Sequence, residues 1–128
     1  PELAQRMRRV VALLPAPAPA VPVLSHGDLS PDQVLTTRDG GQVWLTDFDR
    51  ACLAPRAVDL GSFLSVLDAG TLLDGYRDGG GQLPPRDQLR WAVAASLVLR
   101  AADPLRRASR DWKAGIAANL NQILEVVR

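Results

Sequence analysis

The sequence is short of several features, and each shortage excludes a class of protein. Its single cysteine, Cys52, cannot form a disulfide within the chain, which fits a reducing cytoplasm. No apolar run approaches the roughly 18 residues that a membrane-spanning helix needs. Fifteen basic and 14 acidic side chains leave a net charge of +1, so there is no electrostatic case for nucleic-acid or membrane binding. We expect a cytoplasmic protein that binds neither.

Lysine is almost absent, because Lys113 is the only one in the chain. A phosphate-binding P-loop combines glycines with a lysine that reaches the phosphates. The glycine run over 79–81 has no lysine beside it, so we interpret it as a flexible turn. The chain is also free of internal repeats.

What is present indicates one domain of α+β class, mostly α. With 128 residues, 47% of them hydrophobic, the chain can bury a real core. Apolar stripes at helical spacing predict helices over 2–14, 58–67, 71–77, 86–102 and 109–127. Short apolar runs predict strands over 21–24, 34–37 and 42–46. The prolines of 15–20 predict an extended connector after the first helix, and Asp39-Gly40 predicts a hairpin between the last two strands.

Acidic residues concentrate around that hairpin. Five of the 14 fall between Asp28 and Asp49. In an antiparallel hairpin the start of one strand lies beside the end of the other, so the loop of Asp28, Asp32 and Gln33 should meet the loop of Asp47 and Asp49. Carboxylates brought together in this way repel each other unless a cation offsets the repulsion. Such oxygen ligands suit Mg²⁺ or Mn²⁺ and phosphoryl transfer.

Three stretches in order resemble a known family. They are His26-Gly27-Asp28-Leu29-Ser30-Pro31-Asp32-Gln33, then Leu45-Thr46-Asp47-Phe48-Asp49-Arg50-Ala51, then Val58-Asp59-Leu60. They are similar to the motifs of the aminoglycoside phosphotransferase (protein-kinase-like) family: H-G-D-x-x-x-x-N, D-F-[DE], and a buried Asp opening the next helix. The resemblance is specific from about residue 23 to 63. It implies the C-terminal catalytic lobe of a protein-kinase-like fold, whose small hairpin carries the catalytic and metal loops.

The resemblance implies roles for individual residues. Asp28 would be the catalytic carboxylate that accepts or orients the proton of the acceptor hydroxyl. Asp47 would hold a metal ion bridging the nucleotide phosphates, together with Gln33 at the position of the family's Asn. Glutamine is one methylene longer than asparagine, so we expect weakened or rearranged metal binding.

Other residues would support this site. The resemblance implies that His26 holds the loop by packing and hydrogen bonds, and that Asp59 braces the loop backbone from the following helix. We expect Asp32 and Asp49 to lie around the site without binding the metal, or to be solvated. Arg50 receives no role.

The resemblance also implies parts that we do not find. The family's glycine-rich loop and strand lysine have no counterpart before His26, so we expect residues 1–128 to be a partial catalytic lobe, with the nucleotide-binding lobe absent. ATP would be the co-substrate but would need that lobe, and the chain alone would be inactive. Apolar surface left bare, with the first helix beside it, would favour self-association.

Other readings remain open. Bases outnumber acids from Leu60 onward, which favours a neutral or less charged alcohol or sugar over a polycationic acceptor. One alternative function is a non-catalytic, kinase-derived binding or oligomerisation module. A less favoured one is a phosphohydrolase with Asp47 as an aspartyl nucleophile, which would want Thr or Val at Ala51 and a suitably placed lysine.

Overall fold

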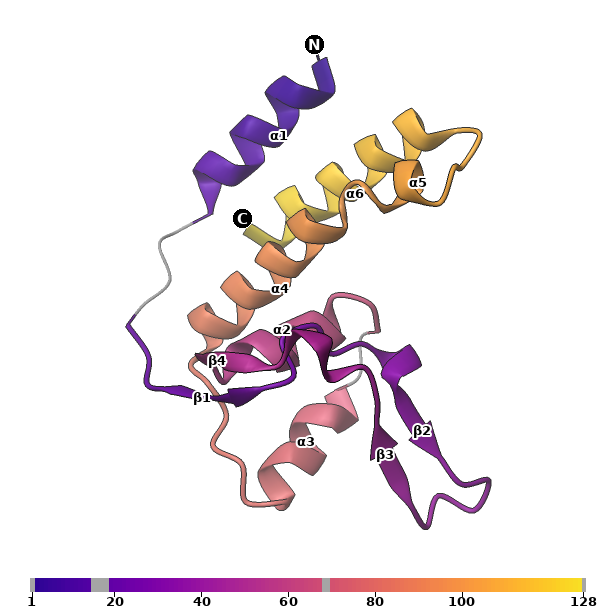
Figure 1. Cartoon of the computed structure of the whole chain (residues 1–128). Helices are drawn as coiled ribbons and strands as arrows, with labels where there is room; N and C mark the ends of the chain where they lie inside the picture. Colours follow the sequence, from indigo (N-terminus) through magenta and orange to yellow (C-terminus); the bar gives the residue numbers. More distant parts are fainter. Residues whose placement is uncertain (1, 15–18, 68–69, 128) are drawn as a thin grey trace.

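Helices make up most of the chain, with two small sheets beside them (Figure 1). The structure is a computed structural model that describes residues 2–14, 19–67 and 70–127. The predicted connector over 15–20 therefore lies largely outside the described residues. The helices are α1 (Glu2–Leu13), α2 (Ala57–Leu64), α3 (Gly70–Asp78), α4 (Arg86–Arg100), α5 (Asp103–Arg106) and α6 (Trp112–Val127). The predicted α+β, mostly α class is confirmed.

Each sheet has two antiparallel strands. Strands β2 (Val34–Thr36) and β3 (Val43–Leu45) form the predicted hairpin, with Val34 opposite Leu45. At its tip the Gly40 N–H donates to the carbonyl of Thr37 over 2.9 Å, and Gly40 adopts a φ of 72°, which glycine reaches without strain. The hairpin projects away from the helices (Figure 1).

The second sheet was predicted only in part. Strand β1 (Pro22–Ser25) was expected, but its partner β4 (Cys52–Pro55) was not. The register places Leu24 opposite Leu53. Because β1 leads directly into the loop of Asp28, this pairing fixes where that loop begins.

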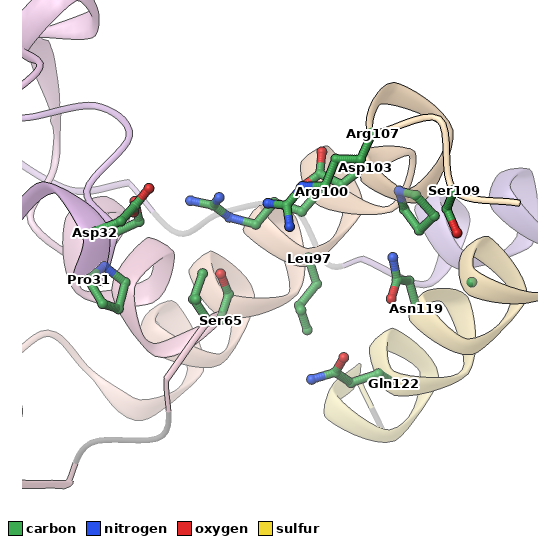
Figure 2. A pocket seen from close by; sticks show the side chains of 14 residues that line it. Pro31, Asp32, Ser65, Leu97, Arg100, Asp103, Arg107, Ser109, Asn119 and Gln122 are labelled. Atoms are coloured by element: carbon green, nitrogen blue, oxygen red, sulfur yellow. The ribbon is translucent and has the colours of Figure 1, made fainter. Parts of the chain in front are cut away.

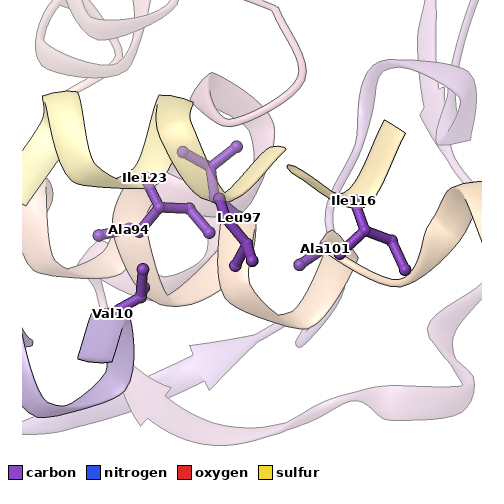
Figure 3. Close-up of a cluster of buried hydrophobic side chains, with 7 residues drawn as sticks. Val10, Ala94, Leu97, Ala101, Ile116 and Ile123 are labelled. Atoms are coloured by element: carbon purple, nitrogen blue, oxygen red, sulfur yellow. The ribbon is translucent and has the colours of Figure 1, made fainter. Parts of the chain in front are cut away.

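The hydrophobic core lies where α1, α4 and α6 meet (Figure 3). Its buried side chains are Val10, Ala94, Leu97, Ala101, Ile116, Leu120 and Ile123. Leu120 and Ile123 have no exposed surface. The predicted apolar stripe of the last helix therefore faces the core, as its spacing indicated.

The helices differ in how much of their apolar surface is covered. Helix α1 packs on the core through Val10, which is 1% exposed, and through Leu3 and Met7, whereas Val11 is half exposed. Helix α4 is apolar on most sides, a pattern that indicates a buried helix. Leu99 is 70% exposed, because α2 and α6 cover only part of this helix.

Helix α2 connects the sheets to the helical core. It packs closely on α4, and Gly61 makes the approach possible, since a Cβ there would lie 2.5 Å from the Cβ of Ala92. Across the described ranges, every helix falls short of the length and apolarity that a membrane crossing would require.

Candidate active site

The loop that follows β1 and the loop that follows β3 meet at one end of the hairpin. The N–H of Thr46 donates to the carbonyl of Gln33 over 3.0 Å, continuing the strand pairing by one residue. The Gln33 side chain then lies beside Asp47, with 3.4 Å between Nε2 and Oδ2. The predicted meeting of these two loops is therefore confirmed for Gln33 and Asp47.

Asp28 lies between two arginines. Its Oδ1 atom is 3.3 Å from Nη2 of Arg100 on α4, and its Oδ2 atom is 3.6 Å from Nη1 of Arg50. The Asp28 side chain is 40% exposed, so it is open to small molecules. Both carboxylate oxygens thus face positive charge, at distances longer than the roughly 2.7–2.9 Å of a strong charge-assisted hydrogen bond.

His26 is buried and joins the two loops. Its Nε2 atom lies 2.8 Å from the carbonyl oxygen of Thr46, and because a carbonyl can only accept, this nitrogen carries the proton. The imidazole also packs against Phe48, with ring centroids 4.9 Å apart. Nδ1 is buried and has no hydrogen-bond partner among the described residues. These contacts hold the loop of Asp28 against the residues on either side of Asp47.

Asp59 binds the backbone at the start of the same loop. Its Oδ2 accepts the N–H of His26 at 2.7 Å, and its Oδ1 accepts the N–H of Gly27 at 2.9 Å. The predicted hydrogen bonds are confirmed, although Asp59 is half-buried rather than largely buried. Gly27 has a φ of 87°, and a Cβ there would come 2.1 Å from the carbonyl oxygen of Arg50. The turn before Asp28 therefore requires glycine.

Asp47 and Gln33 have an arrangement that local sequence does not reveal. Asp47 takes a left-handed backbone conformation, with a φ of 67°, at the start of the 3-10 helix η2 (Phe48–Arg50). Gln33 ends the 3-10 helix η1 (Pro31–Gln33), and its Oε1 accepts the N–H of Ser30 at 2.9 Å. The amide oxygen therefore points back into its own loop, and the amino group faces Asp47.

The donor atoms present fit a metal shared with a substrate. Within the described ranges no three His, Cys, Asp or Glu side chains group closely enough to hold a metal ion. Mg²⁺ often binds through one or two carboxylates while substrate phosphates and water complete its shell, and Asp47 can supply one such carboxylate. The Gln33 oxygen accepts the Ser30 N–H, and the group that Gln33 turns toward Asp47 is its amino group, which cannot ligate a cation.

The two remaining acids lie around the site. Asp32 is exposed and accepts a hydrogen bond from the hydroxyl of Ser30. This hydrogen bond, with backbone N–H groups and more distant arginines, lowers the pKa of Asp32 below its usual value. Asp49 is exposed within η2. Among the hydrogen bonds and ion pairs of the described residues, neither Asp32 nor Asp49 contacts Asp28 or Asp47.

Two cavities flank the loop of Asp28. A small one of about 190 Å³ contains Asp28 itself, and a larger one of about 750 Å³ opens beside Asp32. Arg100 and Asp103 line both. Figure 2 shows the larger cavity, with Arg100 reaching from α4 toward the side of Asp32 and with Arg107 close to Asp103.

Sequence reasoning missed Arg100, the nearest cation to Asp28. It lies 72 residues further along the chain, and nothing in the pattern around it marks it as a site residue. Its Nη2 atom is also 3.2 Å from the hydroxyl of Ser62 on α2, which positions the guanidinium. Arg50, for which we predicted no role, is the second cation at Asp28.

Comparisons with known proteins bear on the fold and the family of the chain. A crystal structure of a choline/ethanolamine kinase family protein from Mesorhizobium loti superposes with a TM-score of 0.65 and 17% sequence identity, covering 98% of this chain. The chain spans 44% of the length of that protein. Curated protein sequences give no match. The family model described as the phosphotransferase enzyme family matches residues 1–113. Since this match covers most of the chain, the protein belongs to the phosphotransferase enzyme family, as its ordered motifs predicted.

Proposed function

We propose that this chain forms the catalytic part of a kinase that transfers a phosphoryl group from ATP to a hydroxyl group of a small molecule. The observation that carries the proposal is the joining of the two acidic loops. His26 and Gln33 tie the Asp28 loop to the residues around Asp47. The family match and the fold of the neighbouring structure support the same class of reaction.

We assign Asp28 the role of catalytic base, because its side chain is 40% exposed and it follows the turn that Asp59 holds. Its carboxylate would accept the proton of the acceptor hydroxyl while that oxygen forms a bond to the γ-phosphorus. The bond between the γ-phosphorus and the bridging oxygen breaks, and ADP leaves with that electron pair. Asp59 and Gly27 position Asp28 for this step through the backbone of the loop.

Asp47 would hold the metal ion. Mg²⁺ or Mn²⁺ bound there together with ATP would neutralise the charge on the phosphates. Asp47 comes after strand β3 in the chain, and its carboxylate lies beside the amino group of Gln33. That amino group can donate to Asp47 and so fix the carboxylate's orientation.

We further propose that ATP needs groups beyond these 128 residues. The only lysine, Lys113, lies over the ring of Trp112 at 5.5 Å and lines a cavity between α1 and α6, not the cavity that contains Asp28. No lysine is therefore available at Asp28 to reach the phosphates in the way that kinases use one. The chain alone should be inactive.

A second candidate is a non-catalytic binding module derived from a kinase. Two observations favour it. Both oxygens of Asp28 face arginines, and the amide oxygen of Gln33 is bonded to Ser30. A carboxylate paired with two arginines, beside an amide that turns its amino group toward Asp47, would be suited to binding without transfer.

Activity of an Asp28 variant separates the two candidates. We would measure ADP formation from ATP, with a panel of small alcohols, in the full-length protein that carries this sequence. Asp28→Asn should lower the rate by about a hundredfold to ten-thousandfold. Asp39→Asn, in the exposed hairpin turn, is the matched control and should leave it unchanged. Equal rates for wild type and Asp28→Asn, or no transfer by either, would favour the binding module.

A further inference from the structure

The small cavity at Asp28 has more positive than negative charge. Three guanidinium groups line it, those of Arg50, Arg100 and Arg106, against two carboxylates, those of Asp28 and Asp103. Arg106 pairs with Asp103 at 3.1 Å. The other two arginines share the single carboxylate of Asp28. One positive charge is therefore left without a partner within the cavity.

The shared ion pair is loose. Its distances of 3.3 and 3.6 Å exceed those of a bidentate arginine–carboxylate pair. A guanidinium binds a carboxylate or a phosphate more strongly when two parallel N–H groups donate to it. A ligand anion entering the cavity could make that contact, while Asp28 makes only one long contact to each arginine.

The pairing also conflicts with the role of Asp28 in transfer. To accept a proton from a hydroxyl, a carboxylate needs an oxygen that faces the hydroxyl within about 2.6–3.2 Å. Both oxygens of Asp28 face arginines instead. An anion that draws Arg100 or Arg50 to itself would release an oxygen of Asp28 and would bring its own hydroxyl next to it.

From these observations we propose that the acceptor is a small alcohol bearing a carboxylate or phosphate group, bound by Arg100 with Arg50. This inference rests on the proposed function, because it identifies the acceptor of that transfer. Arg100 is the anchor: its side chain is 28% exposed against 70% for Arg50, and the Ser62 hydroxyl helps to hold it. Arg50 can close over the bound anion.

The size of the cavity limits the ligand. Its volume of about 190 Å³ corresponds to about six water molecules of liquid volume, the space of a three- or four-carbon hydroxy acid. Arg100 and Asp103 also border the 750 Å³ cavity, so the two cavities lie against the same pair of side chains.

The same cavity disfavours a cationic amino alcohol. The excess guanidinium charge would repel it, and no aromatic side chain lines the cavity among the described residues, whereas quaternary ammonium groups are bound by aromatic rings. The charge and the lining thus select between acceptors of similar size.

Direct binding tests the proposal without requiring transfer. Calorimetric titration of this chain would use glycerate and glycerol phosphate as anionic alcohols, glycerol as the neutral match and choline as the cationic one. We expect at least one anionic alcohol to bind about tenfold or more tightly than glycerol or choline, and the tighter of the two identifies carboxylate or phosphate as the group.

Substitutions locate the bound anion. Arg100→Met should weaken binding by about tenfold or more, Arg100→Lys should retain part of it, and Arg77→Met on exposed α3 should change nothing. Circular dichroism would verify that each variant is folded. Tighter binding of choline, equal binding by wild type and Arg100→Met, or no binding of any probe would overturn the proposal. If the wild-type full-length protein bound the anionic alcohol but did not turn over ATP with it, that result would instead count against the proposed function.

Discussion

The carboxylate of Asp59 accepts the backbone N–H of His26 at 2.7 Å, across 33 residues of sequence. With the second bond, to the N–H of Gly27, the Asp59 side chain holds both residues before Asp28. Helix α2 and the loop of Asp28 are thereby joined.

Asp59→Ala should therefore destabilise the protein. It removes both acceptors and leaves the N–H groups of buried His26 and half-buried Gly27 unpaired, which costs about 1–3 kcal/mol. Urea unfolding followed by circular dichroism measures this change. Asp74→Ala is the control, because Asp74 forms an exposed ion pair with Arg77 on α3, and it should change the free energy of unfolding by about 0.5 kcal/mol or less. Equal effects of the two substitutions would contradict the bracing role.

Gly27→Ala should be far more damaging than Gly40→Ala. Both glycines have a positive φ, so each substitution costs about 1–2 kcal/mol of backbone strain. At Gly40 the added methyl meets open space, whereas at Gly27 it would overlap the carbonyl of Arg50. The free energies of unfolding should therefore differ by more than about 1 kcal/mol. Similar values would mean that the loop can move away from Arg50 at little cost.

Alanine substitutions at two helical glycines should change the free energy of unfolding in opposite directions. Gly61→Ala places a methyl 2.5 Å from the Cβ of Ala92, and separating α2 from α4 should cost about 1–3 kcal/mol. Gly75→Ala on α3 meets no neighbouring atom within 4 Å, and it should stabilise the protein by about 0.5–1 kcal/mol, because alanine loses less backbone entropy. Thermal unfolding should give a lower Tm than wild type for Gly61→Ala and a higher one for Gly75→Ala. Stabilisation by Gly61→Ala would show that the α2–α4 contact is loose.

Much of the fold could be predicted because local patterns determine it. The hairpin was predicted within about one residue at each end, since the Asp39-Gly40 turn specifies it. Strand β4 was not, because Cys52–Pro55 has no alternating pattern and becomes a strand only by pairing with β1, a distant segment. The exposure of Leu99 was missed for a related reason, since its helix is apolar on several faces and only the packing of other helices decides which are covered.

The contacts of the candidate site could also be predicted only in part. The hydrogen bonds of Asp59 could be predicted from an ordered motif. The contact between Arg100 and Asp28 could not, because α4 is placed there by the packing of α2 against it. The orientation of the Gln33 amide was also beyond sequence, since it depends on where the Ser30 N–H points.

The lowered pKa of Asp32 predicts how the stability of the protein changes at acid pH. The Ser30 hydroxyl is the largest cause of its lowered pKa. A carboxyl whose pKa is lower in the folded state adds stability above its unfolded pKa of about 4. That stability is lost as the pH falls through the folded value. Ser30→Ala should raise the pKa of Asp32 toward 4, measured by NMR titration of the side-chain carboxyl.

A second hydroxyl provides the control for that titration. Asp39 also has a lowered pKa, caused first by the Thr37 hydroxyl and then by the N–H of Gly41. Thr37→Ala should raise the pKa of Asp39 and leave that of Asp32 unchanged. If Ser30→Ala left the pKa of Asp32 where it was, the hydroxyl would not be its partner in solution.

Gln33 provides the last test, because its amide is engaged within the loop and turns its amino group, not its oxygen, toward Asp47. Its oxygen accepts the Ser30 N–H and its amino group faces Asp47. Gln33→Ala should therefore lower the free energy of unfolding by about 0.5–1.5 kcal/mol while changing Mn²⁺ affinity less than about twofold. Asp47→Asn should do the reverse, since removing a charged ligand weakens a cation site. Electron paramagnetic resonance of Mn²⁺, titrated with and without ATP, measures the affinities. Loss of Mn²⁺ binding in Gln33→Ala at unchanged stability would mean that the amide rotates to ligate the metal when it binds.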